Sequence, residues 1–104
     1  MVNLQVKFGN KDLDKLYNQG KTRLKIDKSI IKKFLIMVQR LCYADSINDL
    51  RKPPSNRFEK LQGTDNLFSL RLNVQYRLEF TIDFEDIEKT KGTVTVVRIS
   101  KHYE

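Results

Sequence analysis

The stretch LFSLRLNVQYRLEFTID, Leu67 to Asp83, decides the fold class because its apolar residues recur at every second position. Apolar and polar residues alternate on both sides of Leu70 in the first half and on both sides of Leu78 in the second half. A period of two sends successive side chains to opposite faces of a strand. Because only the short connection Asn73-Val74-Gln75 separates the two runs, the stretch predicts an antiparallel hairpin.

The predicted hairpin has one apolar face and one polar face. The apolar face carries Phe68, Leu70, Leu72, Tyr76, Leu78, Phe80 and Ile82, and the polar face carries Arg71, Asn73, Arg77 and Glu79. An antiparallel sheet commonly packs one face on the core and leaves the other in water. We therefore expect helices to cover the apolar face and the polar face to stay open to solvent.

The rest of the chain supplies these helices and further strands. The expected elements are a strand near Val2 to Phe8, a helix between the caps Asn10 and Gly20, a helix of about Lys28 to Tyr43, a helical turn near Ile47 to Leu50, and a last strand from Thr93 to Ser100. This order predicts an α+β fold, with two N-terminal helices packed on one face of an antiparallel sheet of four to five strands. At 104 residues the chain is expected to form a single domain, 1–104.

For the last predicted strand, it is open which residues point to which face of the sheet. Strict alternation would place Arg98, Ser100 and His102 together on one face. We assign that face to the polar side of the sheet, although Val94 and Val96 would then share it.

The composition excludes several classes of site. The single cysteine, Cys42, excludes an internal disulfide, and with a single histidine it excludes a Cys/His zinc centre. No serine-triad, zinc-protease or phosphate-loop motif is present, so no metal or cofactor is expected. No run approaches the length of a membrane span and the N-terminus lacks the features of a signal peptide, so a cytoplasmic protein without membrane contact is expected.

The net charge of +7 is concentrated in one half of the chain. Residues 1–44 hold ten Lys/Arg and three Asp/Glu, whereas residues 45–104 hold ten of each. A basic segment fits two hypotheses, which are solubility and the binding of a polyanion such as RNA.

The polar face also fits two hypotheses. It offers arginines, a glutamate and, with the chain's end, one histidine, which is the minimal set for cleaving RNA through its own 2′-hydroxyl. Exposed Arg and Glu pairs on strands, however, are mostly solvated cross-strand partners.

Four pieces of the second half resemble a known family. They are NRFEKLQG (56–63), FSLRLN (68–73), QYRLEFTID (75–83) and VVRISKHYE (96–104). In order and spacing these pieces resemble the RelE/ParE toxin superfamily, most of all its HigB ("plasmid maintenance system killer") branch. The resemblance implies a type II toxin that acts as a metal-independent, ribosome-dependent endoribonuclease and cuts messenger RNA in the A site by 2′-hydroxyl attack.

The resemblance also implies roles for individual residues. Glu59 would be the general base, Arg77 would stabilise the phosphate, and His102 would be the general acid. Tyr103 would stack on or position a base, and Arg71 would contact the RNA backbone.

The sequence departs from the family pattern at two places. The family's lysine before the glycine is Gln62 here, so Lys60 or Arg57 would have to supply the missing cationic contact with RNA. The tail reads Lys-His-Tyr-Glu, which is more similar to the His-Tyr ending of YoeB than to the Asp-Tyr-His ending common in HigB proteins.

The partners implied by the resemblance are the ribosome, messenger RNA and a HigA-like antitoxin with a helix-turn-helix. Two alternatives remain open. One is a ParE-like toxin that binds DNA gyrase, which shares the fold but lacks the glutamate and the terminal histidine. The other is an inactive toxin fold retained as a regulator.

Overall fold

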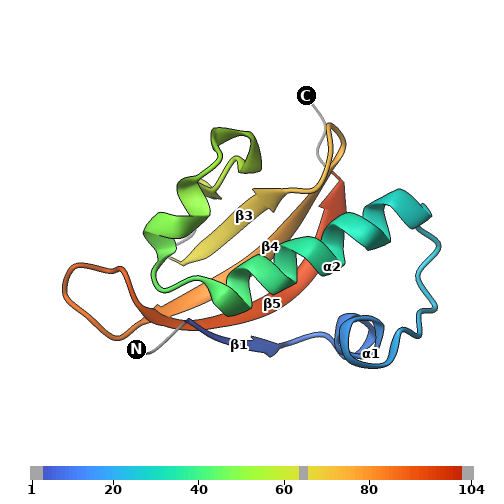
Figure 1. The fold of residues 1–104 in the computed structure, drawn as a ribbon, viewed down its shortest axis with the longest axis horizontal. Coiled ribbons are helices and arrows are strands. Elements are labelled where there is room, and N and C mark those ends of the chain that lie inside the picture. The colour runs from blue at the N-terminus through green and yellow to red at the C-terminus, as the bar shows by residue number, and fades with distance from the viewer. Residues whose placement is uncertain (1–3, 64–65, 102–104) are drawn as a thin grey trace.

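A computed structural model describes residues 4–63 and 66–101 of the chain. Its centre is a five-stranded sheet with the order β1-β5-β4-β3-β2, and helix α2 lies across one face of this sheet (Figure 1). The strands are β1 (Gln5–Phe8), β2 (Glu59–Lys60), β3 (Leu67–Arg71), β4 (Tyr76–Phe84) and β5 (Gly92–Lys101). The helices are α1 (Lys11–Gln19), α2 (Lys28–Tyr43) and the short 3₁₀ helices η1 (Ile47–Arg51) and η2 (Pro54–Asn56). The predicted α+β fold is confirmed.

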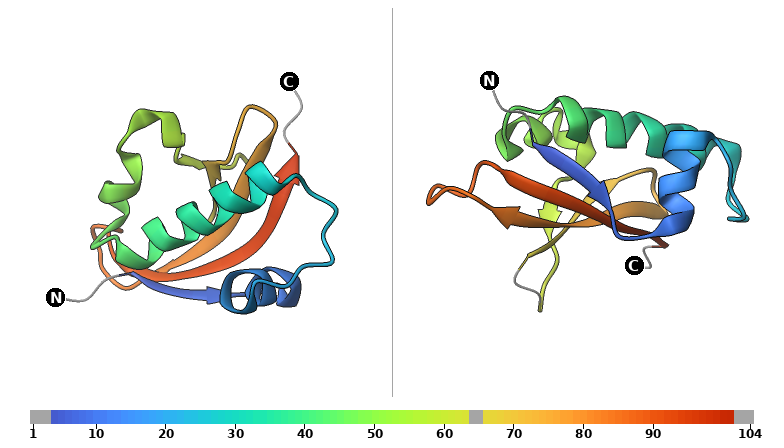
Figure 2. Two further views of the ribbon diagram at one scale, coloured as in Figure 1. Left: turned by 45° about the vertical axis from the view of Figure 1, so that its right-hand side comes forward. Right: turned by 90° about the horizontal axis from the view of Figure 1, so that it is seen from below.

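The two α-helices begin and end where the sequence predicts. Asn10 Oδ1 accepts the N–H groups of Asp12 and Leu13 at 2.9 and 3.2 Å, which satisfies donors that the first turn leaves unpaired. Gly20 ends α1 with a φ of 69°, a left-handed conformation that glycine adopts without strain. α1 then lies at the margin of the sheet beside β1, while α2 covers the sheet's face (Figure 2).

The sheet is mixed rather than wholly antiparallel. β3, β4 and β5 follow one another as an antiparallel meander, and the predicted hairpin is part of it. β1, however, pairs in parallel with β5, with Gln5 opposite Thr93. A parallel neighbour needs a long crossover, and the helices and strands between β1 and β5 supply one.

The core lies between α2 and the apolar face of the sheet. From α2 it receives Phe34, Met37, Val38 and Leu41, all fully buried. Under η1 and η2 the core continues as an aromatic cluster of Phe58, Phe68, Phe80 and Phe84, with ring centroids between 5.5 and 6.4 Å apart.

A β-bulge in β5 determines which of its side chains face the core and which face the polar side. Phe80 is opposite Val96 and Glu79 is opposite Arg98, so Val97 is an extra residue without a partner on β4. An inserted residue reverses the alternation beyond it. Val94 and Val96 therefore face the core, while Arg98 and Ser100 face the polar side as expected. Strict alternation along this strand was the wrong assumption, and His102 lies outside the described residues.

Within residues 4–63 and 66–101, no helix is long and apolar enough to cross a membrane.

The loop between β4 and β5 is organised by one carboxylate. Asp86 accepts the backbone N–H groups of Thr90 and Lys91, both at 2.9 Å, and the hydroxyl of Thr90. These hydrogen bonds, led by that of the Thr90 hydroxyl, hold the pKa of Asp86 below its usual value.

Phe80→Ala should lower the free energy of unfolding by about 3–5 kcal/mol, because Phe80 is fully buried and stacks on both Phe58 and Phe68. The control is Ile87→Ala, since Ile87 is 97% exposed and its loss should change stability by less than about 0.5 kcal/mol. Denaturant unfolding of both variants measures the difference. A similar loss in the two variants would contradict the packing described here.

Asp86→Ala should destabilise the protein in a pH-dependent way. Because the folded pKa of Asp86 is lowered, its contribution is complete above the unfolded value of about 4 and is lost as the pH falls through the folded value. The stability difference between wild type and variant should therefore be constant near pH 6 and shrink on acidification below about pH 4. A difference that does not change with pH would show that these hydrogen bonds do not favour the charged form.

Candidate functional site

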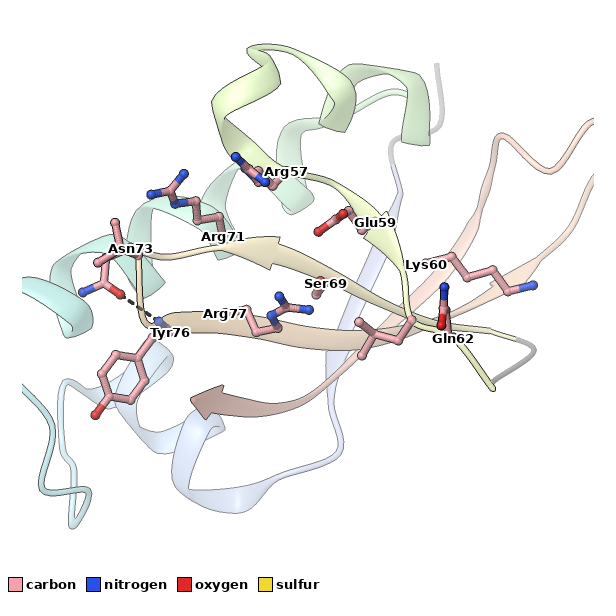
Figure 3. Close-up of a pocket in the computed structure, with 11 residues that line it drawn as sticks. Arg57, Glu59, Lys60, Gln62, Ser69, Arg71, Asn73, Tyr76 and Arg77 are labelled. Atoms are coloured by element: carbon pink, nitrogen blue, oxygen red, sulfur yellow. Dashed lines mark hydrogen bonds between the residues drawn. The ribbon is translucent and has the colours of Figure 1, made fainter. Parts of the chain in front are cut away.

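A half-open cavity of about 670 Å³ lies on the polar face of the sheet (Figure 3). It is lined by Arg57, Glu59, Lys60, Leu61, Gln62, Ser69, Arg71, Asn73, Val74, Tyr76 and Arg77. Five of the residues singled out from the sequence, Arg57, Glu59, Lys60, Arg71 and Arg77, thus come together in one place. His102 and Tyr103, the other two, lie outside the described residues.

The floor of the cavity is set by cross-strand register. Ser69 of β3 is opposite Glu59 of β2 on one side and opposite Glu79 of β4 on the other. One step along the same face, Arg71 is opposite Arg77. Because serine is the smallest of these side chains, it leaves a depression that the longer side chains surround. Figure 3 shows Glu59 pointing from β2 toward the middle of this space and Arg77 pointing toward Ser69.

The outer wall is held in place by Phe58. Arg57 ends η2 with a left-handed φ of 48°, which turns the chain into β2. Phe58 then stacks on Phe68 with ring centroids 5.5 Å apart, and the guanidinium of Arg51 lies 5.2 Å from the centre of its ring. Since Phe58 points inward, its neighbours Arg57 and Glu59 must point outward, toward the cavity.

The turn between β3 and β4 closes one end of the cavity. Asn73 Oδ1 accepts the N–H groups of Gln75 and Tyr76 at 2.8 and 2.7 Å, a turn typical of asparagine. Tyr76 and Val74 therefore belong to the cavity wall, although the sequence pattern had identified them only as strand and connection.

Glu79 does not have the environment expected for it. It lies on the polar face but is only 6% exposed, so the prediction of a solvated residue is wrong. Its Oε1 accepts a hydrogen bond from Arg98 Nε at 2.8 Å in an ion pair. The bulge at Val97 is the reason, because it brings Arg98 rather than Val97 opposite Glu79. The sequence analysis placed Arg98 on the polar face but missed its pairing with Glu79, because that pairing depends on the bulge.

The charges in the cavity are unbalanced. Four cations, Arg57, Lys60, Arg71 and Arg77, line it together with one carboxylate, that of Glu59. Arg71 and Arg77 are directly opposite each other, and in the described part of the chain neither has a carboxylate within salt-bridge distance. Such a cluster of unpaired cations is suited to binding an anion, and phosphate matches the geometry of arginine. Among the described residues, no cluster of His, Cys, Asp and Glu has the arrangement of a metal site.

Solved structures show the class of protein to which this fold belongs. The YoeB dimer from Staphylococcus aureus superposes with a TM-score of 0.53 at 17% identity, over 98% of this chain and 100% of that one. A YoeB/ParE toxin from Agrobacterium tumefaciens gives 0.54 at 12% identity, over 96% and 100%. The fold is that of the RelE-like toxins.

Sequence relatives identify the family within that class. The model of a RelE-like toxin of type II toxin–antitoxin system HigB matches residues 6–103. Toxin HigB-1 of Vibrio cholerae is 37% identical over 78 residues, which are 74% of this chain and 82% of that protein. An uncharacterised protein of Haemophilus influenzae is 33% identical over 89 residues, 84% and 88% of the two chains. The chain belongs to the HigB-like family of toxins.

Arg71→Gln should stabilise the protein, because like charges directly opposite on a sheet repel each other. The expected gain is up to about 1 kcal/mol at low ionic strength. It should shrink near 1 M salt, where the screening length falls to about 3 Å. Lys7→Gln is the control, since Lys7 is on the edge strand β1 in register with the uncharged Thr95. Equal stabilisation by both substitutions would point to net charge, not to the Arg71–Arg77 pair.

Proposed function

We propose that this toxin is a ribosome-dependent endoribonuclease that cleaves messenger RNA in the A site. The observation that supports this most directly is the cavity, which is lined by the Glu59 carboxylate together with the side chains of Arg57, Arg71 and Arg77. A base beside unpaired arginines is the equipment that phosphodiester cleavage by an internal nucleophile requires.

In the proposed reaction the nucleophile belongs to the substrate. Glu59 takes the proton of the ribose 2′-hydroxyl, O2′ attacks the neighbouring phosphorus, and the bond from phosphorus to O5′ breaks. Arg77 stabilises the negative charge of the pentavalent phosphorane. His102 donates the proton that O5′ needs to leave. The products are a 2′,3′-cyclic phosphate and a 5′-hydroxyl end, and no metal takes part.

The remaining wall residues suit a nucleotide. A cavity of about 670 Å³ lies within the size range of small-molecule sites. Tyr76 offers an aromatic ring at one end, on which a base can stack, and Tyr103 is proposed as a second aromatic contact. Arg71, Arg57 and Lys60 would hold the RNA backbone, with the last two compensating for Gln62.

A second cationic surface supports a ribosomal partner. In the connector between α1 and α2, Lys21, Arg23 and Lys25 are exposed, while Leu24 and Ile26 are half-buried against the core. This connector lies at one end of the molecule and the acidic loop between β4 and β5 at the other (Figure 1). Such a charge asymmetry would orient the protein on ribosomal RNA, whose phosphates attract the basic end. Action on ribosomes implies a cytoplasmic location.

A protein partner follows from the family. Toxins of type II systems act with an antitoxin, and a YoeB–YefM complex from Staphylococcus aureus superposes on this chain with a TM-score of 0.51 at 18% identity, covering 98% of this chain and 100% of that one. We propose that this toxin is neutralised by a HigA-like antitoxin with a helix-turn-helix.

Primer extension on a defined messenger RNA tests the function. Purified protein should produce cuts at A-site codons when programmed ribosomes are present and none when they are absent. Cuts without ribosomes would refute the ribosome dependence. Absence of cuts in both reactions, with gyrase enriched in a pull-down, would favour the ParE-like alternative, and absence of both would favour a regulator.

Glu59→Gln should lower the cleavage rate on ribosomes by about 10²- to 10⁴-fold, the usual contribution of a general base. Glu88→Gln, in the acidic loop, is the matched control and should cleave like wild type. Rates come from the accumulation of cut transcript with ribosomes in excess. Cleavage by Glu59→Gln at the wild-type rate would remove Glu59 from the mechanism.

A further inference from the structure

We infer that Arg98 is a positioning residue, which holds the buried Glu79 carboxylate and thereby keeps Arg77 available to an anion in the cavity. The consequence for catalysis rests on the proposed function. Glu79 lies on the polar face between Arg77 and Arg98, and it does not line the cavity.

The geometry allows Glu79 to pair with either arginine. Arg98 is directly opposite it on β5, and its Nε donates to Glu79 Oε1 at 2.8 Å. Arg77 precedes Glu79 by two residues on β4 and so points to the same face, with Cα atoms roughly 6.5–7 Å apart. Arginine side chains are long enough to cover that separation. Arg77 is thus a second cation within reach of the same carboxylate.

Burial makes the choice of partner important. Only 6% of Glu79 is exposed while Arg98 is paired with it, so the carboxylate depends on that partner more than on water. A buried carboxylate without a compensating charge is strongly unfavourable. Removal of Arg98 should therefore draw the nearest free cation toward Glu79, and among the described residues Arg77 has no carboxylate partner that would hold it back.

The recruitment of Arg77 would have a specific effect on the site. Figure 3 shows its guanidinium over the floor near Ser69, where it is placed to meet a phosphate. Once paired with Glu79, the guanidinium would be partly neutralised and turned from the cavity. Arg98 does not line the cavity and its side chain is 56% exposed, so it would influence the reaction only through this competition.

The first test follows the Arg77 side chain by NMR and does not need a cleavage reaction. The Nε–Hε signal of Arg77, assigned by its loss in Arg77→Lys, should move in Arg98→Met, since a new carboxylate partner changes its hydrogen bonding. In the double variant Arg98→Met/Glu79→Gln it should return to the wild-type position, because the charge that attracts it is gone. An Arg77 signal that stays in place in Arg98→Met would overturn the inference. If Arg98→Met does not fold, Arg98→Gln, which also removes the positive charge, replaces it in the same comparison. The Arg77 signal should move in Arg98→Gln, and a signal that stays in place would overturn the inference equally.

The second test measures cleavage on ribosomes in the same variants. Arg98→Met should lower the rate by about tenfold or more, since it withdraws a donor from the transition state. The double variant should recover to within about threefold of wild type, a non-additivity that identifies coupled residues. The single variants Glu79→Gln and Arg98→Lys leave no buried carboxylate unpaired. Their cleavage rates should therefore also be close to that of wild type.

The outcomes separate this inference from a purely structural role and from the proposed function. If the ion pair only stabilised the fold, the double variant, which lacks both charges, would recover cleavage activity only as far as it recovered its melting temperature. That result would overturn the inference. If wild type itself does not cut messenger RNA, the proposed function fails, and the Arg77 signal still decides whether Arg98 controls it.

Discussion

The bulge at Val97 in β5 is the constraint on which both the core and the site depend. Before it, Val94 and Val96 face α2; after it, Arg98 faces the polar side. The bulge is itself held from outside the meander. The N–H of Gly9 donates to Val96 O at 2.8 Å, and Asn10 Nδ2 donates to Val97 O at 3.3 Å. Asn10 therefore caps α1 and fastens the bulge with the same side chain, so that the N-terminal segment and the polar face are mechanically linked.

The fold holds the charged residues of the polar face in positions that electrostatics alone disfavour. Arg71 and Arg77 repel each other across the hairpin, and Glu79 is a buried charge that requires a partner. The aromatic cluster on the other face, in which Phe68 contacts the three other rings, supplies the packing that keeps these strands in register. A site on paired strands is also more rigid than one on loops, so the charged side chains start from a defined geometry.

The features that sequence analysis predicted are those that depend on local pattern. The hairpin around Leu78 and helix α2 follow from hydrophobic periods, and the caps of α1 follow from residue types with known backbone preferences. The features it missed depend on pairing between distant segments. The parallel pairing of β1 cannot be read from β1 itself, and the bulge leaves no signal in the β-branched run around Val97. The burial of Glu79 and its pairing with Arg98 were missed for the same reason, and the cavity-lining position of Ser69 required the registers of three strands.

The form of the cavity also bears on the proposed need for a ribosome. Cleavage by a 2′-hydroxyl requires O2′, phosphorus and O5′ to lie nearly in line, and holding reactants in such a geometry accounts for a large share of catalysis. The chain contributes cations, a carboxylate and an aromatic ring around a half-open depression whose floor residue, Ser69, is small and would give a nucleotide few contacts. A free RNA strand would be bound there by charge but poorly oriented. A ribosome that presents the messenger in a bent, fixed conformation would supply the missing order. In the proposed reaction, the place where the ribosome holds the RNA would set the substrate specificity, and the polar face would supply the chemistry.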